Sequence, residues 1–396
     1  NNVSGYQWNA QLTLAPDTEY CYRVYLGTSP ETEIDLLGSN QSPHFRTQVP
    51  AGSTQPFSFA VFGDWGAVDS AGQNPQQANL LARLAASGAR LALTTGDTAY
   101  PNGSQTNYGD LVQTGSNIST VFGPTFWAVP GASLPLFPAM GNHGFSSSSA
   151  LHPHLLNWPQ DRAVATSGGR YIKETYCCLN NTTSAVYPSV WYAFDAGLAR
   201  FYVLETAWAS SNVGTADVYK NDYDYHWAPT TAQYQWLQAD LAAHPSALKF
   251  AFFHYPLYVD NPNEASDPYL TTGSASLESL LKQYGVDIAF VGHAHLYQRN
   301  LPRPNGIINY VTGGGGANLS PIGPCTSYDA FGIGWSYSSG GKACGSATKP
   351  TATDNVFHFL LVALNGTSAT VTPIDSTGQS FDAITYNFSA GAESNA

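Results

Sequence analysis

Short apolar runs that end beside glycine or a polar side chain recur along the chain. The clearest covers residues 90–95, where leucine, alanine and threonine residues follow one another and the run stops at Gly96. Runs of this length, bounded by glycine and rich in apolar and β-branched residues, are typical of buried β-strands. The same pattern predicts strands over residues 57–62, 134–140, 248–253 and 286–291.

Apolar residues at helical spacing lie between some of these runs. They predict helices over residues 76–86 and 232–242, and another around residues 277–281. A succession of strand, helix and strand implies parallel crossover connections, so the sequence predicts an α/β fold. Residues 145–189 are rich in Ser, Thr, Asn and Tyr without strong periodicity, and we expect a long surface excursion of uncertain structure there.

The first fifty residues follow a different pattern. Short runs separated by Pro, Gly and Ser turns predict antiparallel strands over residues 11–14, 19–26 and 44–47. The stretch Val-Pro-Ala-Gly-Ser at residues 49–53 indicates a boundary. This part resembles the end of a fibronectin type III sandwich, cut short at its amino terminus, and we expect it to be a packing module. The predicted division is therefore residues 1–50 and a catalytic domain over residues 51–396.

Composition and charge limit the classes of partner. Of 396 residues, 43% are hydrophobic and only 11% charged, a composition that indicates a folded, globular chain rather than a disordered one. A net charge of −12 with 15 Lys and Arg argues against a nucleic-acid partner, which needs a basic surface. A small phosphate ester is compatible with this charge because bound cations invert the local field. No apolar run is long enough to span a membrane and no leader peptide pattern opens the chain, so we expect a mature, soluble form without a stable membrane anchor. The oligomeric state is left open.

Asn-x-Ser/Thr acceptors for glycosylation are frequent. They stand at Asn2, Asn40, Asn117, Asn180, Asn181, Asn318, Asn365 and Asn387. Asn102 has the same pattern but lies two residues after Tyr100, where a glycan would crowd the site described below. So many acceptors in a chain poor in charge favour a secreted eukaryotic glycoprotein over a bacterial exoprotein, and both are extracellular.

The chain has five cysteines. Cys325 and Cys344 bracket a loop rich in Gly and Ser, and we expect them to close it as a disulfide. Cys177 and Cys178 are adjacent, so they either form a vicinal disulfide or one of them pairs with Cys21. No CxxC spacing supports a thiolate metal site.

Each predicted strand of the catalytic domain is followed by a side chain able to bind a metal. These side chains are Asp64, Asp97, Asn142, His254, His293 and His295. Ligands collect at the carboxyl ends of strands in α/β sheets, and this mixture of oxygen and imidazole donors suits Zn, Mn or Fe and suits Ca poorly. An aspartate central in the set, such as Asp97, would bridge two ions. Two ions clamp an ester phosphate and make hydroxide available near neutral pH.

In these residues the chain resembles the binuclear metallophosphoesterases of the calcineurin-like superfamily, and within them the purple acid phosphatases. The resemblance is carried, in order, by Gly63-Asp64-Trp65-Gly66, Gly96-Asp97-Thr98-Ala99-Tyr100, Gly141-Asn142-His143, His254 and Gly292-His293-Ala294-His295. Residues 313–317 and 357–386 also look like the carboxyl end of that family. The resemblance implies an α/β fold, a four-layer αββα sandwich of two mixed sheets.

The resemblance also implies a ligand set. The ferric site would be Asp64, Asp97, Tyr100 and His295, and the divalent site Asp97, Asn142, His254 and His293, with Asp97 shared. Tyr100 would bind Fe(III) as a phenolate, because its hydroxyl ionises near neutral pH only beside a strongly charged cation. The divalent ion would be Zn, Mn or Fe(II), and zinc at both positions is the alternative.

The implied reaction is in-line attack on phosphorus by a metal-bound hydroxide, either terminal on the iron or bridging. His143 would contact the phosphate or protonate the leaving group. The expected function is a secreted phosphatase for phosphate monoesters, with phytase activity as one form of it.

Two departures keep a second function open. Gly144 stands where the family often has an acidic residue, and residues 255–270 lack the histidine that plant-type members carry shortly after the counterpart of His254. The alternative is therefore a phosphodiesterase of the phospholipase C type with the same metal core. A third hypothesis, a glycoprotein binding module with a vestigial site, predicts lost ligands, and none is lost here.

Overall fold

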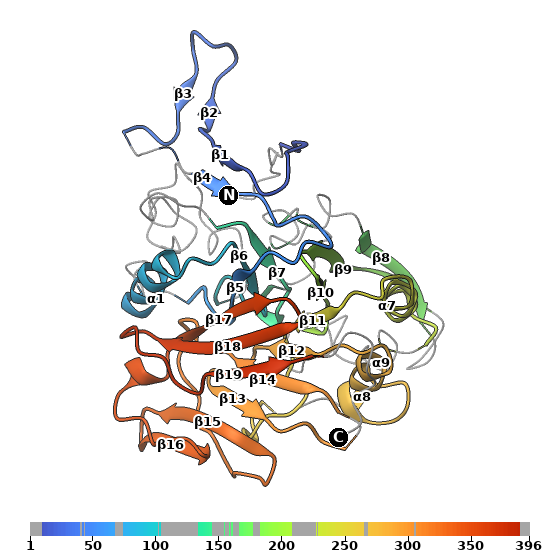
Figure 1. Cartoon of the computed structure of the whole chain (residues 1–396), viewed down its shortest axis with the longest axis vertical. Coiled ribbons are helices and arrows are strands. Elements are labelled where there is room, and N and C mark those ends of the chain that lie inside the picture. The colour runs from blue at the N-terminus through green and yellow to red at the C-terminus, as the bar shows by residue number, and fades with distance from the viewer. Residues whose placement is uncertain are drawn as a thin grey trace.

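The computed structural model describes residues 10–39, 42, 44–67, 74–101, 103, 134–144, 154, 158, 160, 166–176, 183–207, 227, 229–264, 268–304 and 306–388, with backbone alone for 166–176 and 183–190. Two mixed β-sheets form the body of the molecule (Figure 1).

The smaller sheet has six strands in the order β19-β18-β17-β5-β6-β7. Their bounds are β5 (Phe57–Phe62), β6 (Leu91–Thr94), β7 (Leu136–Pro138), β17 (His358–Asn365), β18 (Ser368–Asp375) and β19 (Ile384–Asn387). β5, β6 and β7 are parallel neighbours, and the other pairs are antiparallel.

The larger sheet has nine strands in the order β16-β15-β13-β14-β12-β11-β10-β9-β8. Their bounds are β8 (Thr166–Tyr176), β9 (Thr183–Ala196), β10 (Ala199–Val203), β11 (Leu248–Phe253), β12 (Ile288–Val291), β13 (Tyr297–Asn300), β14 (Ile308–Thr312), β15 (Asp329–Ser336) and β16 (Gly340–Gly345). β10, β11, β12 and β14 run parallel to one another.

Helices flank the sheets: α1 (Pro75–Ala86), α7 (Ala232–Ala243), α8 (Pro268–Thr271) and α9 (Leu277–Gln283), with 3-10 turns η1 (Asn142–Gly144) and η3 (Thr353–Asn355). In Figure 1, α1 lies on the side opposite α7, α8 and α9. α1 starts at Pro75 because the Asn74 side chain accepts hydrogen bonds from the N–H groups of Gln76 and Gln77. The predicted helices and the α/β class are confirmed.

The two sheets pack face to face around aromatic side chains. Phe59 of β5 lies 5.1 Å from Phe201 of β10, 5.7 Å from Phe250 and 6.2 Å from Phe252 of β11, and 6.4 Å from Phe290 of β12. Phe59, Phe201, Phe250, Phe252 and Phe290 are all fully buried. Burying side chains of this size contributes roughly 2–3 kcal/mol each. This core fixes the parallel strands of both sheets, and therefore their carboxyl ends, relative to one another.

The first fifty residues form two small sheets. β1 (Glu19–Cys21) pairs with β4 (His44–Arg46), and β2 (Tyr25–Leu26) pairs with β3 (Ile34–Asp35) in the hairpin at the top of Figure 1. Antiparallel strands are present as expected, but the single strand predicted over residues 19–26 is divided into β1 and β2, which belong to different sheets. Residues 11–14 form no strand. The domain boundary near residue 50 stays a prediction.

The expectation for residues 145–189 is wrong in part. β8 and the first part of β9 lie in this stretch and pair as a long antiparallel hairpin at the edge of the larger sheet. β8 is the edge strand, and its two glycines, a residue type depleted in strands, interrupt the pattern from which a strand is predicted.

Two further expectations concern covalent features. The Cys325–Cys344 disulfide is present, and Cys21 is an exposed free thiol, whereas Cys177 and Cys178 lie outside the described residues. The acceptors Asn318, Asn365 and Asn387 are exposed, as glycosylation requires, and Asn2, Asn40, Asn117, Asn180 and Asn181 lie outside the described residues. No helix in the described chain is long and apolar enough to cross a membrane.

Candidate metal centre

The predicted metal ligands meet where the parallel strands of the two sheets end. Asp64 follows β5, Asp97 and Tyr100 follow β6, and Asn142 follows β7, all in the six-stranded sheet. His254 follows β11, and His293 and His295 follow β12, in the nine-stranded sheet. Each sheet therefore supplies one side of a single cluster.

The first group is centred on the Tyr100 hydroxyl. It lies 3.1 Å from Asp64 Oδ1, 2.9 Å from Asp97 Oδ2 and 3.0 Å from His295 Nε2. His295 Nε2 is also 3.3 Å from Asp64 Oδ1. The four side chains proposed for the ferric site thus converge on one point.

The second group is centred on the Asn142 amide oxygen. His254 Nε2 lies 2.8 Å and His293 Nδ1 3.1 Å from Asn142 Oδ1. His254 Nε2 is 3.4 Å from Asp97 Oδ2, the oxygen that also faces Tyr100. Asp97 therefore lies between the two groups, as a bridging ligand must.

Backbone carbonyls fix the tautomers of two of these histidines. His254 Nδ1 donates to the Thr95 carbonyl at 2.9 Å, and His295 Nδ1 donates to the Asn318 carbonyl at 2.6 Å. Carbonyl oxygens only accept, so in each ring Nδ1 carries the proton and Nε2 presents its lone pair to the cluster. A histidine ligand is normally oriented in this way by a partner on its other nitrogen.

The charge of the cluster calls for cations. Asp64 and Asp97 are almost fully buried, and among the described residues their only ion-pair partners are histidines. Burial, and then the charges of Asp64 and Asp97, raise the pKa of Tyr100 well above its ordinary value. Asp64, Asp97 and His254 offer ligand atoms that all lie within 4.8 Å of one another. Buried carboxylates beside inward-facing imidazoles fit bound metal ions.

The backbone is strained at three of the candidate ligands. Asp64, Asp97 and His293 have φ angles of 58°, 51° and 67°, in the left-handed region that non-glycine residues rarely adopt. Strain of this kind costs of order 1–3 kcal/mol per residue and is found at functional sites. At Gly141, a Cβ atom would lie 2.1 Å from Asp97 Oδ1, so only glycine admits the aspartate there.

His143 lies at the open side of the cluster. Its backbone N–H donates to Asp97 Oδ1 at 2.8 Å, its Nδ1 donates to the Pro101 carbonyl, and its ring packs on Tyr100 at 4.4 Å. The side chain is 35% exposed and Nε2 is 4.0 Å from Asp97 Oδ2. His143 Nε2 is therefore available to a ligand that enters from solvent.

Other residues of the site were missed by the sequence analysis. Thr95 and Asn318 act through their backbone carbonyls, which no side-chain pattern reveals. Glu205 is fully buried after β10, and its raised pKa reflects burial first, with the charges of His254 and Asp97 acting on it as well. Glu264 lies in a loop without a predictive pattern, although its carboxyl is within electrostatic reach of His295.

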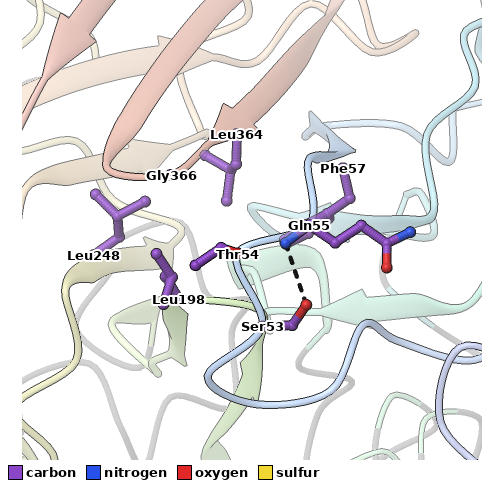
Figure 2. A pocket seen from close by; sticks show the side chains of 8 residues that line it. All are labelled: Ser53, Thr54, Gln55, Phe57, Leu198, Leu248, Leu364 and Gly366. Carbon is purple, nitrogen blue, oxygen red and sulfur yellow. Dashed lines mark hydrogen bonds between the residues drawn. The ribbon is translucent and has the colours of Figure 1, made fainter.

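A small cavity elsewhere is not part of this site. Figure 2 shows that Ser53, Thr54, Gln55, Phe57, Leu198, Leu248, Leu364 and Gly366 line it. Phe57 and Leu248 are the first residues of β5 and β11, whose far ends precede Asp64 and His254. The cavity therefore lies at the opposite ends of these strands from the metal-ligand cluster.

Comparison with known proteins shows the family to which the chain belongs. The calcineurin-like phosphoesterase family model matches residues 57–297. A nucleotide pyrophosphatase/phosphodiesterase of Hordeum vulgare is 26% identical over 314 residues, 70% of this chain and 73% of that protein. Purple acid phosphatase 22 of Arabidopsis thaliana is 26% identical over 287 residues, 69% of this chain and 53% of that protein.

The fold is that of a solved plant enzyme. Purple acid phosphatase PPD1 from yellow lupin (Lupinus luteus) superposes with a TM-score of 0.61 at 20% identity, over 94% of this chain and 60% of that chain. The two mixed sheets expected from the resemblance are thus confirmed. Because the family model spans more than half of the sequence, the expected class, a phosphoric ester hydrolase, is confirmed at the level of the family. The chain belongs to the calcineurin-like phosphoesterase family, and the purple acid phosphatases are among its relatives there.

Proposed function

We propose that this protein is a binuclear phosphatase that hydrolyses phosphate monoesters. The observation that carries the proposal is the position of Asp97 between two groups of donors, Tyr100 with Asp64 and His295 on one side and Asn142 with two histidines on the other. Two carboxylates and a phenol suit a trivalent ion, and a neutral amide with two imidazoles suits a divalent one. We therefore assign Fe(III) to the first group and Zn, Mn or Fe(II) to the second.

The chain's own residues would bind and orient the substrate. When bound, the two ions would supply a nucleophile from water and neutralise charge on the phosphoryl oxygens. Thr95 and Asn318 hold the rings of His254 and His295, so the positions of their ligand nitrogens are fixed before a substrate arrives. His143 Nε2 would contact the phosphate or give a proton to the leaving oxygen, because Nδ1 is already engaged with the Pro101 carbonyl.

A phosphodiesterase is the second candidate. The described part of the loop after His254 carries Glu264 and no histidine, so a proton donor expected for monoester hydrolysis is missing there. The barley relative bears the name of a phosphodiesterase. Hydrolysis of an aryl phosphate monoester and of the matching bis-aryl diester decides between the two candidates.

The experiment uses native protein, protein stripped of metal by a chelator, and stripped protein reloaded with iron and zinc. We expect activity to disappear on stripping and to return on reloading. Equal activity before and after complete stripping would contradict the proposal.

We further propose that the protein is a secreted glycoprotein. The support is the number of acceptor asparagines and the exposure of Asn318, Asn365 and Asn387. A shift in electrophoretic mobility after glycosidase treatment of protein from its native source is the test, and an unchanged mobility would count against it.

A further inference from the structure

The loop that follows β11 carries Glu264 to the edge of the metal centre. Glu264 Oε1 accepts a hydrogen bond from Ser320 Oγ at 2.9 Å, and Oε2 accepts one from Asn261 Nδ2 at 2.9 Å. Asn261 Nδ2 also donates to the Pro321 carbonyl at 3.2 Å. Donors from two separate segments thus hold both carboxyl oxygens, so the carboxylate keeps a fixed position and its ionised form is favoured by these bonds.

The segment that holds Glu264 also holds a proposed metal ligand. The Ser320 N–H donates to the His295 carbonyl at 2.8 Å, and the Asn318 carbonyl accepts from His295 Nδ1. Burial raises the pKa of Glu264, whereas the charge of His295 and the Ser320 hydroxyl act in the opposite direction. The charges of Asp64 and His254 also act on it. Glu264 is therefore within electrostatic reach of residues from both donor groups.

Glu264 differs from the other extra carboxyl group near the centre. Glu205 has no exposed surface, and its Oε1 accepts from the Ala207 N–H inside the core. A substrate cannot meet it there. Glu264 is partly exposed and follows two exposed residues, Pro262 and Asn263. Its carboxyl is held by Ser320, whose N–H contacts the His295 carbonyl, so it lies beside the candidate metal centre and can act on a ligand bound there.

We propose that Glu264 tunes the charge preference of the site by disfavouring the doubly charged phosphomonoester relative to its diester. This proposal rests on the proposed phosphoesterase function. A diester carries one negative charge, whereas a monoester carries nearly two above its second pKa of about 6. A fixed carboxylate beside the centre repels the additional charge of the monoester. Removing the carboxylate should therefore raise kcat/KM for the monoester more than for the diester.

The test measures kcat/KM for an aryl phosphate monoester and its bis-aryl diester at pH 8, where the monoester is doubly charged. The variant Glu264→Gln removes the charge and keeps the shape, and Glu264→Asp keeps the charge. Glu19→Gln, on the exposed strand β1, is the control for net charge. Metal content is measured for every variant. Binding of inorganic phosphate to each metal-loaded protein, by calorimetry, gives a second readout that does not depend on turnover.

We expect Glu264→Gln to raise the ratio of monoester to diester kcat/KM about tenfold, equivalent to about 1.4 kcal/mol. The affinity of Glu264→Gln for phosphate should rise several-fold. For Glu264→Asp and Glu19→Gln, both the kcat/KM ratio and the phosphate affinity should stay within about threefold of the wild-type values. A ratio and a phosphate affinity unchanged in Glu264→Gln would overturn the proposal. If the metal-loaded wild type hydrolyses neither ester, the proposed function fails. The phosphate affinities of the wild type and Glu264→Gln then test separately whether Glu264 repels a bound phosphate.

Discussion

His295 Nδ1 donates to the backbone carbonyl of Asn318 at 2.6 Å, and this bond turns the lone pair of His295 Nε2 toward Tyr100 and Asp64. The imidazole is therefore preorganised as a ligand by a residue far away in the sequence. The His254 ring is oriented in the same way, by a hydrogen bond from its Nδ1 to the carbonyl of Thr95. Partners of this kind raise the affinity for the metal because they remove the cost of orienting the ring.

Replacing His295 with alanine should remove one of the two ions. The other donor group, around Asn142, does not include His295, so we expect about one metal ion per chain by elemental analysis. Activity should fall by about 10³-fold or more, as for other residues that act as part of one catalytic unit. His244→Ala is the matched control, because His244 is a partly exposed histidine at the end of α7 and belongs to neither donor group. Two ions retained in His295→Ala would show that His295 is not a ligand.

Gly141→Ala should disturb Asp97, the proposed bridging ligand, without replacing any proposed ligand. The added Cβ would lie 2.1 Å from Asp97 Oδ1 and 2.4 Å from the Asp97 backbone nitrogen, so Asp97 must move. We expect metal affinity to fall about 10- to 100-fold, as when the surroundings of a metal site are altered. Competition with a chelating dye measures this affinity.

Gly52→Ala is the control for that experiment. Its φ of +81° makes a side chain unfavourable, but nothing lies within 4 Å of the added Cβ. It should cost about 1–2 kcal/mol of stability and leave metal affinity unchanged. Equal metal affinity in both variants would contradict the close approach at Gly141.

His358 should make the protein less stable in acid. It is fully buried, its Nδ1 donates to the Val356 carbonyl and its Nε2 accepts from Thr312 Oγ1. Burial is the main cause that lowers its pKa from 6.5 to about 4. Between these values the unfolded chain binds a proton that the folded chain does not, so the free energy of unfolding falls as the pH is lowered through this window.

The size of the His358 effect follows from the shift. A fall in the pKa of His358 from 6.5 to about 4 corresponds to about 3 kcal/mol of unfolding free energy lost between pH 7 and pH 4. Urea denaturation at several pH values, for the wild type and for His358→Asn, measures it. The variant should show a flatter dependence on pH in this window, and parallel curves for the two proteins would rule out His358 as the cause.

The strands, and the clustering of the proposed ligands at their ends, were predictable because their signals are local. Apolar runs such as residues 248–253 are followed directly by the side chain that they place, here His254. The Cys325–Cys344 disulfide was predictable for the same reason, since the two cysteines close one loop. The hairpin of β8 and β9 was not, because its residues follow no hydrophobic alternation that distinguishes an edge strand from a loop.

The surroundings of the ligands were beyond the reach of sequence patterns. The carbonyl of Asn318 meets His295 only because the loop after β14 returns over the end of β12. Glu264 reaches the centre through Ser320, a residue 56 positions away in the chain. Contacts of this kind depend on how loops pack once the two sheets have formed, and a single sequence carries no periodic signal for them.

The visible absorption spectrum tests the central claim most directly, because Tyr100 lies within hydrogen-bonding distance of three other proposed ligands of the ferric site. Natively loaded protein and the Tyr100→Phe variant would be compared, together with their metal contents. We predict a broad visible band with about one iron per chain in the wild type, lost in the variant, because a phenolate bound to Fe(III) absorbs visible light. A colourless wild type that holds two zinc ions and still cleaves phosphate esters would contradict the iron assignment.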